Sequence, residues 1–97
     1  MVYISNSKPS IIVNKINESQ YIVEVNHNSH TIHEVTLNKN IYTKISNNLV
    51  TPEKLIHLSF VFLLERESNQ SILSKFNLDI IQTYFPEYSN EIKKLFK

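Results

Sequence analysis

An apolar segment that begins at a well-formed helix cap constrains the fold of this chain most. Thr51 is typical of an N-cap, because its hydroxyl accepts a hydrogen bond from an unpaired backbone N–H, and Pro52 suits the first helical position. Only two polar side chains interrupt the run from residue 55 to residue 64. At about 100° per residue, its apolar side chains occupy nearly the whole circumference, whereas a surface helix has one apolar stripe. The sequence therefore predicts a helix over residues 52–64 that is buried on several sides, within the monomer or at a subunit interface.

The composition excludes several classes of function. With 97 residues, 41% of them hydrophobic and 20% charged, the chain is expected to form one globular domain over residues 1–97. It has no cysteine for disulfides or thiolate zinc sites, and no glycine for phosphate-binding loops or a hydrolase serine elbow. A net charge of +1 gives no electrostatic basis for binding nucleic acid or a membrane surface. The apolar segment is too short to span a membrane and the N-terminus does not resemble a signal peptide, so a cytoplasmic protein is expected.

The first half of the chain has the alternation of strands separated by polar turns. Three strands are predicted, over residues 11–16, 21–25 and 31–37. For the hairpin between the last two, a three-residue loop over residues 28–30 would pair Val23 with Val35 and give a cleaner apolar face than a two-residue loop. Residues 39–45 have helical spacing but could also form a fourth strand.

The second half predicts helices after a polar break at residues 68–70. A helical turn or two is expected over residues 71–76, a helix capped by Asn77 and ended by Pro86 follows, and a last helix begins near Ser89. The predicted fold class is α+β: a small antiparallel meander of about three strands, packed against one long apolar helix and two or three short C-terminal helices.

The C-terminal half also carries a resemblance to known sequences. It rests on the following stretches: residues 51–56 (TPEKLI), 59–60 (SF), 62–67 (FLLERE), 71–73 (SIL) and 84–88 (YFPEY), with Phe76, Leu78 and Ile81 between them. In these stretches the chain resembles a set of short bacterial proteins of unknown function. The resemblance implies a small bacterial protein and indicates no activity or cofactor.

The histidines suggest a metal site. In the three-residue-loop register, His27 and His33 are diagonal neighbours about 7 Å apart, and His57 could supply a third ligand. A zinc site needs three or four convergent ligands. The alternative is structural: His27 flanks an exposed turn and His33 lies at the margin of the core.

Two further clusters are candidates for contact with a partner. Glu65, Arg66 and Glu67 end the long helix, where an acidic pair opposes the helix dipole and is expected to bind the backbone of a turn or a partner. Tyr84 and Tyr88 belong to an aromatic cluster that could pack in the core or form the lip of a binding surface. No nucleophile paired with a base accompanies either cluster, so an enzyme is not expected.

The leading hypothesis is a non-catalytic protein–protein interaction module that acts as a homodimer, since two-fold dimers are the commonest oligomers. One alternative is a regulator associated with nucleic acid, which would use the face formed by Lys93, Lys94 and Lys97. The other alternative is a metal-binding protein that uses the hairpin histidines. No cofactor is expected.

Overall fold

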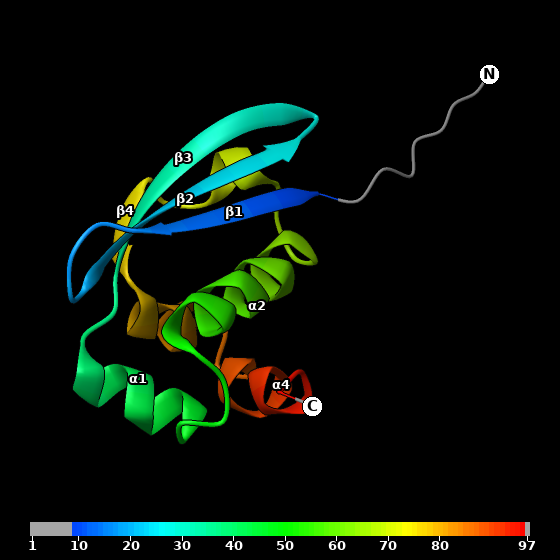
Figure 1. The fold of residues 1–97 in the computed structure, drawn as a ribbon. Coiled ribbons are helices and arrows are strands. Elements are labelled where there is room, and N and C mark those ends of the chain that lie inside the picture. Colours follow the sequence, from blue (N-terminus) through cyan, green and yellow to red (C-terminus); the bar gives the residue numbers. More distant parts are fainter. Residues whose placement is uncertain (1–8, 97) are drawn as a thin grey trace.

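The computed structural model describes residues 9–96, which form a twisted sheet with helices packed below it (Figure 1). The strands, in the order in which they lie side by side, are β1 (Ser10–Lys15), β2 (Gln20–His27), β3 (Ser29–Thr36) and β4 (Lys75–Asn77). The helices are α1 (Lys39–Ser46), α2 (Pro52–Leu64), α3 (Ile81–Tyr84) and α4 (Tyr88–Lys94), with the 3-10 turns η1 (Asn69–Ser71) and η2 (Leu78–Ile80). The α+β class is confirmed, but the sheet is mixed and has four strands among the described residues.

The fourth strand corrects the prediction of a helical turn over residues 71–76. β4 pairs in parallel with β3, with Phe76 opposite Val35. A parallel partner requires a long crossover connection, and here α1 and α2 lie within it. A strand of three residues is too short for its alternation to be recognised, so its pairing depends on tertiary contacts that no local pattern records.

The hairpin between β2 and β3 is two residues tighter than predicted. Val23 pairs with His33, not with Val35, and Asn28 alone separates the last pair, His27 and Ser29. Asn28 has φ 71°, the left-handed conformation that asparagine tolerates better than most residues. A shift of two residues keeps every side chain on its face of the sheet. The apolar face was therefore correctly predicted, but the pairing of residues between β2 and β3 was wrong.

The long helix is confirmed, and the same chain buries it. Thr51 Oγ1 accepts a hydrogen bond from the backbone N–H of Lys54 at 3.1 Å, and Pro52 is the first helical residue. α2 packs against β1, α4 and α1. Seven of its side chains are buried: Leu55, Ile56, Leu58, Ser59, Phe60, Phe62 and Leu63. The helix that motivated a dimer is therefore covered within the monomer.

The remaining helices settle the alternatives left open by the sequence. Residues 39–45 lie in a helix, α1, whose N-cap Asn38 accepts a bond from the Ile41 N–H at 2.9 Å. Asn77 makes no side-chain cap, and the segment after it is a 3-10 turn followed by the short α3, which ends before Pro86. Within residues 9–96, none of the helices has the length and apolarity needed to cross a membrane.

Candidate functional site

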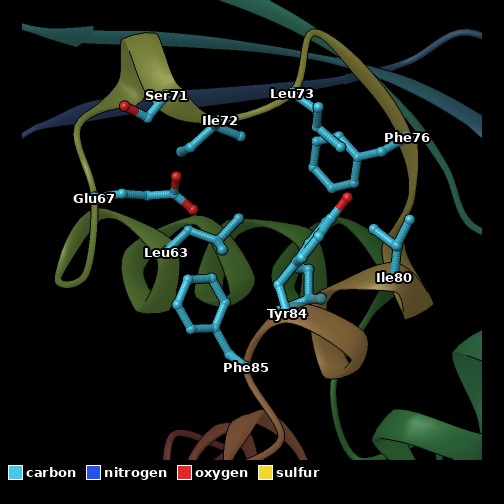
Figure 2. A pocket seen from close by; sticks show the side chains of 10 residues that line it. Leu63, Glu67, Ser71, Ile72, Leu73, Phe76, Ile80, Tyr84 and Phe85 are labelled. Carbon is cyan, nitrogen blue, oxygen red and sulfur yellow. The ribbon is translucent and has the colours of Figure 1, made fainter.

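A pocket of about 390 Å³ lies between the C-terminal end of α2, the segment that leads into β4, and α3 (Figure 2). Its size falls near the lower end of the range of about 300–1,000 Å³ that is usual for small-ligand sites. Ten residues line it: Leu63, Glu67, Ser71, Ile72, Leu73, Phe76, Ile80, Ile81, Tyr84 and Phe85. Most of them are apolar, as is typical of binding sites.

The floor and the mouth of the pocket differ in exposure. Leu63, Ile72 and Phe76 belong to the buried core and form fixed walls. Leu73 and Tyr84 are 46% and 60% exposed, and both stand among the few large apolar side chains that the described chain leaves in water. The pocket is therefore lined by buried core side chains on its floor and by exposed apolar side chains at its mouth.

Of the described residues that line the pocket, Glu67 is the only charged one. Figure 2 shows its side chain reaching from the end of α2 into the pocket, between Ile72 and Leu63. Burial raises the pKa of its carboxyl group, because a desolvated carboxylate is disfavoured. Within residues 9–96, no lysine, arginine or histidine forms an ion pair with it.

A chain of hydrogen bonds fixes the wall that carries Leu73. His33 Nδ1 lies 2.8 Å from the Leu73 carbonyl oxygen and Nε2 lies 2.9 Å from Thr31 Oγ1. Because a carbonyl only accepts, Nδ1 carries the proton that is donated to Leu73. Asn69 Nδ2 donates to Thr31 Oγ1 at 2.9 Å and to the Ser29 carbonyl at 3.0 Å. The polar network thus attaches the segment before β4 to β3.

The five residues predicted to contact a partner lie in three different places. Glu67 and Tyr84 line the pocket. Glu65 is exposed and lies 3.4 Å from the Arg66 guanidinium. Tyr88 is 0% exposed, and its hydroxyl oxygen lies 2.6 Å from Ser59 Oγ, so it is a core residue and not part of a binding surface.

Arg66 has a structural position between α2 and α4. Its Nε donates to Glu87 at 3.0 Å, one terminal nitrogen donates to the Phe62 carbonyl at 3.1 Å, and the guanidinium lies 3.6 Å from the centre of the Phe62 ring. A backbone hydrogen bond and the Arg66 side chain lower the pKa of the Glu87 carboxyl. Arg66 thus pairs with two carboxylates, those of Glu65 and Glu87, and does not line the pocket.

The structure does not bring the candidate metal ligands together. Both ring nitrogens of His33 are engaged in hydrogen bonds, and its strand partner Val23 is four residues from His27. His57 lies on α2, where burial lowers its pKa and its Nδ1 has no partner within the described chain. Among residues 9–96, no group of three histidine, cysteine or acidic side chains is placed to hold a metal ion.

The lysines of the nucleic-acid hypothesis lie at the C-terminal end. Lys93 and Lys94 are exposed on α4, and Lys94 Nζ lies 3.3 Å from Glu91. Lys97 lies outside the described residues.

The chain matches no protein-family description, no curated protein and no solved structure. The resemblance to short bacterial proteins stays a prediction, and the arguments about function depend on the site itself.

Proposed function

We propose that this protein is a non-catalytic protein–protein interaction module that binds a partner through the pocket between α2, β4 and α3. The observation that carries the proposal is the exposed pair Leu73 and Tyr84 at the mouth of an apolar pocket. Interfaces concentrate their binding energy where an aromatic or aliphatic anchor enters such a pocket. A volume of about 390 Å³ suits one or two side chains of a partner.

The lining of the pocket favours binding over catalysis. The described residues of the lining supply one carboxyl group, that of Glu67, and the hydroxyls of Ser71 and Tyr84, but no imidazole, amine or thiol. Nucleophilic catalysis requires a base placed beside the nucleophile, and no such pair is formed in the lining.

The test places a photo-crosslinking amino acid, p-benzoylphenylalanine, at position 84 in cells of the source organism. We expect a discrete crosslinked protein from position 84 and none from the equally exposed position 49, in the turn after α1. The additional change Leu73→Asp should abolish that crosslink, because it puts a charge at the mouth of the pocket. Crosslinking that is equal at both positions, or indifferent to Leu73→Asp, would disprove the assignment of the surface.

Self-association through β1 is the second part of the proposal. β1 has only β2 as a neighbouring strand in the described chain. The Ile16 N–H donates to the Gln20 carbonyl at 2.8 Å. The alternation of an antiparallel ladder then directs the backbone groups of Ile11, Val13 and Lys15 away from the sheet. Such an edge is a template for another strand, and a second copy supplies the same pattern across a two-fold axis.

Light scattering at increasing concentration tests this part. We expect a dimer that the change Ile12→Lys dissociates, because Ile12 is exposed on the edge strand and charges on an edge oppose pairing. The matched control Ile32→Lys lies on the same face of the sheet but in the inner strand β3, and it should leave the dimer intact. A wild-type protein that stays monomeric at millimolar concentration would refute self-association.

A further inference from the structure

The Glu67 carboxylate in the pocket forms no ion pair with any residue between 9 and 96. Arg66, its neighbour in the chain, directs its guanidinium to Glu65 and Glu87. Lys75, at the start of β4, lies near Glu34 instead. Glu67 therefore presents an uncompensated carboxyl group to whatever enters the pocket.

The position of Glu67 just after the C-terminal end of α2 strengthens its attraction for a cation. The backbone N–H of Glu67 bonds to the Leu63 carbonyl at 2.9 Å, so the residue follows directly on the last turn of α2. The carbonyl end of a helix carries a partial negative charge. Surrounding apolar walls reduce screening by water, so a charge in this place interacts more strongly than it would on an open surface.

The same surroundings partly desolvate this carboxylate. Burial without a hydrogen-bonded or oppositely charged partner costs free energy. Glu67 is partly buried, and this desolvation raises the pKa of its carboxyl group because it disfavours the charged form. A bound cation would remove the cost, whereas a purely apolar ligand would increase it by excluding more water.

We infer that the pocket selects a partner segment in which a large apolar side chain is followed by a basic side chain, the first filling the apolar floor and the second pairing with Glu67. This inference rests on the proposed function and adds the chemistry of the partner. Lysine suits the second position, because its long flexible stem can lie against apolar side chains while its ammonium reaches the carboxylate.

The experiment is a methyl NMR titration with three dipeptides: N-acetyl-Phe-Lys-amide, N-acetyl-Phe-Gln-amide and N-acetyl-Phe-Glu-amide. The methyl groups of Ile72, Leu73 and Ile80 report occupation of the pocket. We expect the lysine dipeptide to bind about three- to tenfold more tightly than the glutamine one at low salt, as befits an ion pair partly screened from water, and the glutamate one to bind most weakly. The preference should shrink as salt is added.

The variant Glu67→Gln should remove the preference for lysine, while the matched control Glu65→Gln, an exposed carboxylate two residues earlier, should keep it. A methyl spectrum unchanged outside the pocket shows that each variant is folded. Equal binding of all three dipeptides, or a lysine preference that survives Glu67→Gln, would overturn the inference and leave the proposed function standing. If none of the dipeptides moves the pocket methyls, the pocket is not the binding surface and both proposals fail.

Discussion

The hydrogen bond between Ser59 and Tyr88 connects α2 to α4 inside the core and can be tested quantitatively. The two hydroxyl oxygens lie 2.6 Å apart, and Ser59 Oγ also lies 2.8 Å from the Leu55 carbonyl oxygen. Because the carbonyl only accepts, Ser59 donates its single proton to Leu55 and Tyr88 donates to Ser59. Both side chains are 0% exposed, so water cannot replace a partner that is removed.

The direction of donation predicts unequal effects of the two single substitutions. Tyr88→Phe removes the donor while Ser59 keeps its bond to Leu55, and we expect a loss of about 1 kcal/mol, the net value of an ordinary hydrogen bond. Ser59→Ala leaves the buried Tyr88 hydroxyl unpaired. That costs about 1–3 kcal/mol, and the better helix propensity of alanine offsets only about 0.5 kcal/mol.

The double variant distinguishes this reasoning from simple packing. Ser59→Ala with Tyr88→Phe leaves neither hydroxyl in the core, so its expected cost is about 1 kcal/mol, well below the sum of the single costs. Urea unfolding followed by far-UV circular dichroism measures these free energies, since the chain has no tryptophan and substitution of a tyrosine would alter its fluorescence. Tyr84→Phe, at an exposed tyrosine, is the control and should change stability by less than about 0.5 kcal/mol. Additive single costs, or a larger cost for Tyr88→Phe than for Ser59→Ala, would refute the donor assignment.

Three other predictions follow from single features of the fold. Burial raises the pKa of Tyr88 to about 12 from 10.0, so the contribution of its neutral hydroxyl to stability is present below pH 10 and is lost as the pH rises toward 12. Between these two pH values, the free energy of unfolding should therefore fall more for the wild type than for Tyr88→Phe. Asn28→Ala should cost about 1 kcal/mol in urea unfolding because φ is 71° there, whereas Asn28→Gly should cost nothing. Arg66→Lys should cost about 1 kcal/mol in thermal unfolding, because an ammonium cannot stack on Phe62 while bonding to Glu87; equal melting temperatures would contradict this.

The elements that could be predicted from the sequence are those whose signals are local. α2 has a cap, a proline and an apolar run within a single segment, and each of these acts over a few residues. The alternation of β2 and β3 likewise gave the correct faces, because the side-chain period of a strand does not depend on its partner. The exact pairing did depend on Asn28, whose left-handed conformation closes the tighter turn, and nothing in the adjacent residues distinguishes that turn from a longer one.

The candidate site was only half visible in the sequence. The acidic pair at the end of α2 opposes the helix dipole and so drew attention to Glu67, which does line the pocket. Tyr84 and Tyr88 look alike in sequence, yet Pro86 ends the helical segment between them, so one reaches the mouth of the pocket and the other enters the core. Leu73 and Phe76 were missed because their place depends on β4, whose pairing with β3 crosses forty residues of chain.

The way β4 is attached to β3 explains why the pocket wall that carries Leu73 could not be predicted from local sequence patterns. Its three residues form too short a ladder to hold the preceding segment by backbone bonds alone. The side chains of His33 and Asn69 add hydrogen bonds of 2.8 to 3.0 Å between this segment and β3. These bonds hold the backbone at Leu73 next to β3. The histidine that the sequence offered as a metal ligand therefore has both nitrogens committed to positioning the mouth of the pocket. A polar residue within an apolar strand face signals that a partner is present, but only the assembled fold shows whether that partner is a metal ion, a ligand or, as here, the wall of a binding site.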